Sequence, residues 1–163
     1  IGKSTIVCGH YTNINQPGQH MTWLRDPLAR DISHFNYDCK YGNELSKDFT
    51  QHLSMMSGNF MVLWLYGKYI GRHDSVSMEA RYESVRKVLK EKFFRVYDSD
   101  KFEESWNEVS DILKIAPEPR LRSNQSEKDY KKIQKLEDLS EKFKTWHRSY
   151  NHYDYLLYEE FCK

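Results

Sequence analysis

Residues 19–35 read Gln19-His20-Met21-Thr22-Trp23-Leu24-Arg25-Asp26-Pro27-Leu28-Ala29-Arg30-Asp31-Ile32-Ser33-His34-Phe35. The first seven residues form a largely apolar run that is typical of a strand. Asp26 can cap a helix, and Pro27 suits the first helical position. The apolar residues that follow recur at helical spacings of four, three and four at Leu28, Ile32, Phe35 and Cys39. We therefore predict a strand that leads directly into an amphipathic helix.

Further elements follow on both sides of this unit. Strands are predicted at residues 5–8 and 94–97, and helices within residues 44–67, 78–93, 102–113 and 139–161. Asp100 and Glu103 have the spacing of a capping box for the helix that carries Phe102 and Trp106. The pattern indicates one α/β domain over residues 1–163, with a helix-rich C-terminal half.

Composition excludes several classes of protein. The 163 residues include 25 Lys and Arg against 24 Asp and Glu, so no overall basic field is present to bind nucleic acid. The longest apolar run, residues 60–66, is much shorter than the roughly 18 residues of a membrane-spanning helix. We expect neither nucleic acid as a partner nor a membrane span in this chain. The oligomeric state stays open.

Cysteine and histidine spacing give no metal motif. Cys8, Cys39 and Cys162 are an odd, widely separated set, which argues against a disulfide framework and leaves a single bridge open. No histidine spacing in the chain favours zinc, so no metal site is expected.

The junction after the strand is the first candidate site. Ligands of parallel sheets bind at the carboxyl ends of strands, beside helix N-termini that favour anions. Arg25 would offer a planar fork to a phosphate there, and Arg30 and Ser33 share a helix face at a spacing of three. The alternative makes Arg25 a salt-bridge partner and Ser33 a surface residue.

The stretch from Trp23 to Phe35 resembles the 3′-phosphate-binding segment of sulfotransferases that use 3′-phosphoadenosine 5′-phosphosulfate (PAPS). In that family a strand ends in Arg-Asp-Pro, and a helix with Arg and Ser follows. The resemblance implies a P-loop-like fold, a three-layer parallel sheet flanked by helices. It also implies that Arg25, Ser33 and Arg30 bind the cofactor, with PAPS as donor and adenosine 3′,5′-bisphosphate as product.

Two further segments extend the resemblance. Gly9-His10 is similar to the Gly-His pair of the heparan sulfate 2-O-sulfotransferase and uronyl 2-O-sulfotransferase group, which implies that His10 is the catalytic base. A neutral imidazole suits that work, although His10 can instead cap a strand. The loop at residues 121–128 resembles the family's late basic loop, which implies cofactor contacts from Arg122, Asn124 and Lys128. Asn124-Gln125-Ser126 is also a glycosylation sequon, a use that conflicts with a cofactor role.

The family's loop for the 5′-phosphosulfate lies upstream of the Gly-His pair, and this chain shows no such loop. We expect a fragment that lacks the N-terminal strand and that loop. The resemblance implies sulfuryl transfer to a sugar hydroxyl of a polysaccharide or glycan. By charge alone, acidic acceptors would suit Lys40, Lys68, Arg72 and His73. The implied location is the Golgi lumen, with a membrane anchor upstream, for a eukaryotic enzyme and the cytoplasm for a bacterial one.

Two alternatives stay open. One is a non-catalytic nucleotide- or glycan-binding protein that retains the 3′-phosphate pocket. The other is a nucleotide kinase built on Gly2-Lys3-Ser4-Thr5, which resembles the end of a phosphate-binding loop. The predicted strand directly after these residues disfavours the kinase, because that loop should lead into a helix.

Overall fold

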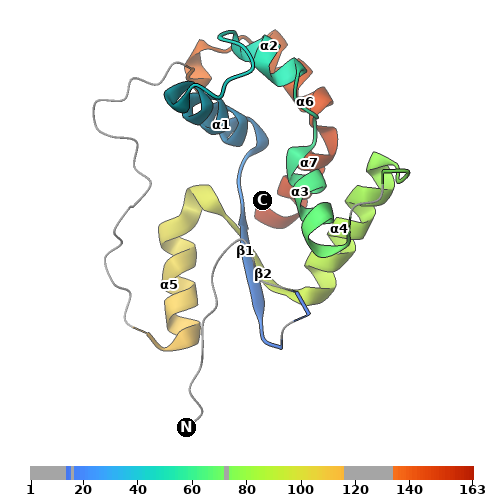
Figure 1. Cartoon of the computed structure of the whole chain (residues 1–163). Coiled ribbons are helices and arrows are strands. Elements are labelled where there is room, and N and C mark those ends of the chain that lie inside the picture. The colour runs from blue at the N-terminus through green and yellow to red at the C-terminus, as the bar shows by residue number, and fades with distance from the viewer. Residues whose placement is uncertain (1–13, 16, 72–73, 116–133) are drawn as a thin grey trace.

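The computed structural model of the protein describes residues 14–15, 17–71, 74–115 and 134–163 (Figure 1). It is a helix-rich α/β fold with a small parallel sheet, as the sequence predicts at this coarse level. In chain order the elements are β1 (His20–Leu24), α1 (Pro27–Tyr41), α2 (Phe49–Ser54), α3 (Phe60–Tyr69), α4 (Met78–Lys92), β2 (Phe93–Asp98), α5 (Phe102–Leu113), α6 (Glu141–Tyr150) and α7 (His152–Cys162). Short 3₁₀ turns lie at Ser99–Lys101 and Leu136–Asp138.

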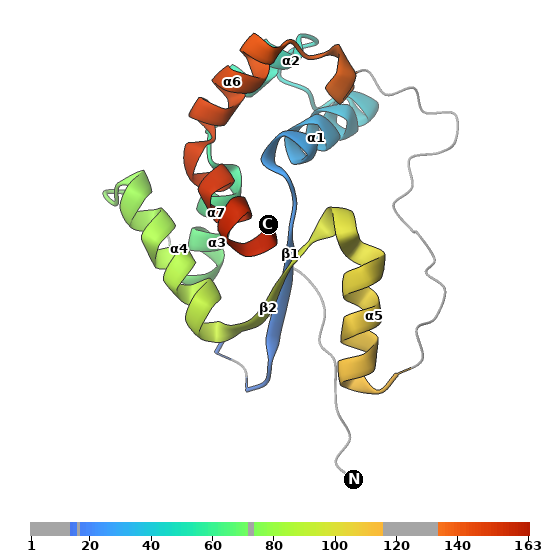
Figure 2. The same ribbon diagram turned by 180° about the vertical axis from the view of Figure 1, so that it is seen from behind.

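The two strands pair in parallel, with Trp23 opposite Tyr97 and Leu24 opposite Asp98. Trp23 and Tyr97 turn toward α5, where their rings stack at 5.4 Å between centroids and the Ser105 hydroxyl accepts the Trp23 indole N–H. Leu24 turns to the opposite face and packs against α3, α4 and α7. Helices therefore cover both faces of the sheet, as Figures 1 and 2 show.

The predicted strand and helix around Arg25 are confirmed. The Asp26 carboxylate caps α1 and Pro27 occupies its first turn, while Gly42 ends the helix in the left-handed conformation with φ of 71°. The predicted apolar face of α1 is buried against α2, in a cluster made of Leu28, Ile32, Phe35, Phe49 and Leu53. The sequence was sufficient to predict this unit because the capping residue, the proline at the helix start and the apolar spacing all indicate the same helix.

Three predictions about helix boundaries are wrong. The capping box of Asp100 and Glu103 does not form: the Asp98 carboxylate accepts the Asp100 N–H, and α5 begins without a side-chain cap. The C-terminal helical pattern is divided at Asn151, whose φ of −109° and ψ of 33° are not helical. Phe93, predicted on the α4 face, is instead the first residue of β2.

The division at Asn151 allows α3 and α7 to cap each other. The Asp154 carboxylate, in the first turn of α7, accepts the N–H groups of Met61 and Val62 at 2.9 Å each, in the first turn of α3. The Asn59 side-chain oxygen, just before α3, accepts the N–H groups of Tyr153 and Asp154 at 2.8 and 3.2 Å. Each helix start thus satisfies the free N–H groups of the other.

The backbone is tightly packed where the residues before α3 meet the residues before α7. Asn59 adopts the left-handed conformation with φ of 58°, and its own N–H donates to the Asn151 side chain at 2.9 Å. A Cβ atom on Gly58 would lie 2.5 Å from the carbonyl oxygen of Tyr150. Only glycine therefore fits at position 58 without displacing the chain before α7.

Burial raises the pKa of Asp154 from 3.8 to about 6, against the two backbone hydrogen bonds that favour the carboxylate. The folded-state pKa lies above the unfolded value, so the folded chain binds more protons between pH 4 and 6. The contribution of this group to stability is therefore present below pH 4 and is lost as the pH rises through 6.

We predict that the unfolding free energy of the wild type, relative to Asp154→Asn, falls by about 2 to 3 kcal/mol between pH 3.5 and 7. Urea denaturation of both proteins at several pH values measures this difference. Asp48→Asn, at the exposed cap of α2, is the control for replacing a cap carboxylate without burial. A difference between wild type and Asp154→Asn that stays constant with pH would contradict the prediction.

Candidate functional site

Arg25 lies where β1 ends and α1 is about to begin. Its side chain is 42% exposed, and its Nε lies 3.5 Å from a carboxylate oxygen of Asp100, which is 50% exposed. Asp100 follows β2, so the carboxyl ends of the two parallel strands bring these side chains together. The pair is an ion pair without a hydrogen bond to that Nε. An exposed pair of this kind contributes little stability and leaves the guanidinium available to a stronger anion.

The start of α1 is less open to anions than its sequence suggests. One carboxylate oxygen of Asp26 accepts the N–H groups of both Leu28 and Ala29, at 3.0 Å each. These donors, which a free helix N-terminus would offer to an anion, are therefore already satisfied, and a negative charge lies beside them. An anion at this junction would have to be held by side chains.

Arg30 and Ser33 differ in whether their side chains are accessible to a bound anion. The Arg30 side chain is only 17% exposed, pairs with the adjacent Asp31 carboxylate, and lies 4.3 Å from the centre of the Phe60 ring. Ser33 is exposed on α1. Arg30 is thus engaged inside the fold, whereas the Ser33 hydroxyl faces solvent on the helix that follows Arg25.

The remaining predicted site residues cannot be placed. His10, Arg122, Asn124 and Lys128 lie outside the described residues, as do Gly2-Lys3-Ser4-Thr5 and the strand predicted at residues 5–8. Of the predicted cofactor contacts, Arg25 directly precedes α1, and Arg30 and Ser33 lie on α1, one engaged inside the fold and one facing solvent. Asp100 is the neighbour that the structure gives to Arg25.

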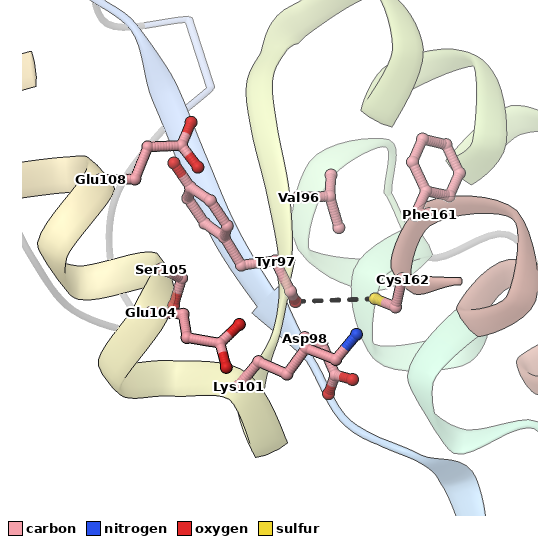
Figure 3. A pocket seen from close by; sticks show the side chains of 9 residues that line it. All are labelled: Val96, Tyr97, Asp98, Lys101, Glu104, Ser105, Glu108, Phe161 and Cys162. Atoms are coloured by element: carbon pink, nitrogen blue, oxygen red, sulfur yellow. Dashed lines mark hydrogen bonds between the residues drawn. The ribbon is translucent and has the colours of Figure 1, made fainter.

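A pocket of about 230 Å³ lies along β2, between α5 and the end of α7 (Figure 3). Its charged lining residues are Asp98, Glu104, Glu108 and Lys101. Three carboxylates against one ammonium make a poor site for a phosphate. At one side, burial raises the pKa of Cys162 to about 12, so this thiol stays protonated and unreactive.

A chain of polar side chains is buried between α1, α6 and α7. A His147 ring nitrogen, Nε2, lies 2.9 Å from a carboxylate oxygen of Asp31, and Nδ1 lies 3.1 Å from the Tyr155 hydroxyl. We call Asp31, His147 and Tyr155 the polar seam. An acid, an imidazole and a hydroxyl in a row have the composition of a proton relay, but all three are buried and no substrate can reach them. The polar seam therefore holds α1, α6 and α7 together and does not act on a substrate.

Scans against models of known protein families, curated proteins and solved structures find no match to this chain. The helices of the described segments are all too short or too polar to cross a bilayer.

We predict that Asp26→Ala lowers the unfolding free energy by about 1 kcal/mol, because the Leu28 and Ala29 N–H groups lose their acceptor. Ser33→Ala, on the exposed face of the same helix, should change it by less than about 0.5 kcal/mol. Urea denaturation of the two variants measures both effects. An unchanged stability of Asp26→Ala would show that the cap does not hold this junction.

Proposed function

We propose that the chain carries the 3′-phosphate-binding part of a PAPS-dependent carbohydrate sulfotransferase. The observation that supports this most directly is the position of Arg25, half-exposed at the carboxyl end of a parallel strand and directly before a capped helix. Parallel strands with helices on both faces are also what a P-loop-like fold would require of this region. The P-loop-like fold itself is part of the proposal.

A phosphate would replace Asp100 as the partner of Arg25. A phosphate group presents several charged oxygens to the guanidinium fork and can accept two parallel hydrogen bonds. The ion pair with Asp100 joins the Arg25 Nε to a carboxylate oxygen at 3.5 Å, and both side chains are about half exposed. The exposed Ser33 hydroxyl is a further donor on α1, and Arg30 would support the site from inside through Asp31.

The reaction follows from the assignment of His10. The sugar hydroxyl oxygen forms a bond to the sulfur of PAPS while the bond from sulfur to the 5′-phosphate oxygen breaks. His10 takes the hydroxyl proton, and adenosine 3′,5′-bisphosphate leaves with the electron pair of the broken bond. A neutral imidazole has the basicity for this proton transfer near neutral pH.

For the acceptor we propose an acidic glycan. The Lys68 ammonium lies 4.7 Å from the Trp64 ring centre and 5.3 Å from that of Tyr69. Trp64 is itself exposed. An aromatic face beside an ammonium can bind the apolar side of a sugar ring and a carboxylate or sulfate on it.

We predict that adenosine 3′,5′-bisphosphate binds the chain and that Arg25→Ala weakens binding about 10- to 100-fold, because a charged hydrogen-bond donor to the phosphate is lost. Arg25→Lys should weaken it by less, because the charge remains and only the fork is lost. Ser33→Ala should weaken it about 3- to 10-fold, the effect of one neutral hydrogen bond. Calorimetric titration measures all of these affinities.

Two further variants test whether the effect on binding is specific to Arg25. Asp100→Asn should raise the affinity about 2- to 5-fold, because the carboxylate that competes for Arg25 is removed. Arg95→Ala is the matched control: Arg95 lies on the neighbouring strand, is comparably exposed and forms a similar ion pair with Glu108 at 3.1 Å. Equal loss in Arg95→Ala and Arg25→Ala would remove Arg25 from the phosphate site.

We predict that His10→Ala lowers kcat for sulfuryl transfer about 10²- to 10⁴-fold and leaves the affinity for adenosine 3′,5′-bisphosphate nearly unchanged, since a general base acts only in the transition state. The measurement uses a form of the protein that transfers sulfate from PAPS to an acidic glycan. Full turnover by folded His10→Ala would contradict the role. Tight binding without any transfer in the wild type would favour a non-catalytic binding protein.

A further inference from the structure

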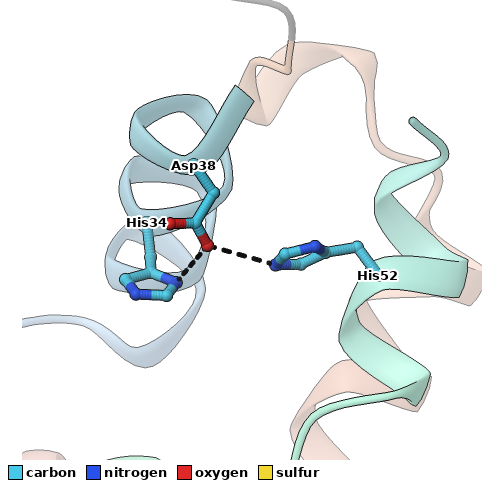
Figure 4. A group of neighbouring side chains, drawn as sticks. All are labelled: His34, Asp38 and His52. Atoms are coloured by element: carbon cyan, nitrogen blue, oxygen red, sulfur yellow. Dashed lines mark ion pairs between the residues drawn. The ribbon is translucent and has the colours of Figure 1, made fainter. Parts of the chain in front are cut away.

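Two histidines and an aspartate converge between α1 and α2, as Figure 4 shows. His34 and Asp38 lie one turn apart on α1, and His52 comes from α2. One carboxylate oxygen of Asp38, Oδ2, lies 3.2 Å from His34 Nδ1 and 3.7 Å from His52 Nε2. These three atoms all lie within 4.8 Å of one another. Each can act as a metal ligand.

The spacing of the three atoms fits a single small ion. Two ligand atoms that bind zinc tetrahedrally, each at about 2.0 to 2.1 Å, are roughly 3.3 Å apart. The two measured distances to Asp38 lie close to this value. The distance between the two histidine nitrogens is within 4.8 Å, so an ion would draw the two imidazole rings closer together than they lie in its absence.

Burial provides a second, independent indication. The His52 side chain is only 1% exposed, yet its Nε2 has no hydrogen-bond partner among the described residues. The atom faces the Asp38 carboxylate, which is 13% exposed, at a distance too long for a hydrogen bond. A buried polar atom without a partner is uncommon in native proteins and calls for an explanation such as a missing ion.

We propose that His34, Asp38 and His52 bind a divalent transition-metal ion, with zinc as the preferred one. Two imidazole nitrogens and one carboxylate oxygen suit zinc, whereas magnesium and calcium prefer oxygen ligands alone. Three protein ligands leave a fourth position for water or another ligand. His34, 42% exposed, lies on the open side and gives the ion a path of entry. The site does not depend on the sulfotransferase assignment.

The proton on His52 has a defined place in this binding. His52 Nδ1 accepts the N–H of Leu45 at 3.1 Å, so the neutral ring carries its proton on Nε2. When the ion binds at Nε2, that proton moves to Nδ1 and none is released. The Leu45 N–H must then leave this nitrogen, and Leu45 is an exposed residue in the connection between the two helices. Zinc binding should thus change the conformation of this connection.

The test is a zinc titration of chelator-treated, dialysed full chain by calorimetry. We expect one zinc ion per chain with micromolar or tighter affinity in the wild type. His34→Gln should weaken binding at least tenfold, because a direct ligand is removed from the exposed side, where folding does not depend on it. His152→Gln, an exposed histidine at the start of α7, is the matched control and should bind zinc as the wild type does.

Two additional measurements make the result decisive. Asp38→Asn keeps the size of the side chain and should also weaken zinc binding at least tenfold. Cobalt(II) bound by the wild type should give the intense visible absorption of a four-coordinate ion, and this absorption should be lost in His34→Gln. Absence of zinc binding to the wild type, or equal affinity in the wild type and His34→Gln, would overturn the proposal.

Discussion

The mutual capping of α3 and α7 is the interaction on which the other contacts of the fold depend. Asp154 completes the first turn of α3, and Asn59 completes the first turn of α7. Neither helix has a cap of its own, since Asn59 and Asn151 make no local side-chain cap bonds. With the two helix starts locked together, α7 packs against α4 and β2, and α6 is directed back over α1.

The polar seam links α6 and α7 to α1, the helix that follows Arg25. His147 on α6 is held between Asp31 of α1 and Tyr155 of α7, so the orientation of α1 is fixed from the far side. Arg25 lies six residues before Asp31, at the junction between β1 and α1. Two apolar clusters, one around α3, α4 and α7 and one around α1 and α2, lie on either side of these polar contacts. Buried polar groups that are satisfied in this way specify one arrangement more narrowly than apolar packing alone.

Elements that depend on residues close together in the sequence could be predicted from it. Contacts between residues far apart in the sequence could not. Asp26, Pro27 and the apolar spacing after them are neighbours in the chain, so the β1–α1 unit was predictable. Asp100 was misassigned as a cap because Asp98, two residues earlier, has the same chemistry. The spacing of His34 and Asp38 was visible in the sequence, but the approach of His52 depends on how α2 packs. No spacing rule joins Asn59 to Asp154, which are separated by 95 positions and meet only in the folded chain.

The long separation between the two capping residues also bears on how the protein is made. During translation α3 leaves the ribosome well before Asp154 is synthesised, so its first turn stays incomplete while most of the chain is already exposed. An apolar helix in this condition is a target for chaperones and for self-association. Assembly of the domain is therefore a cooperative event that awaits the synthesis of α7, and contacts of such high sequence separation slow folding.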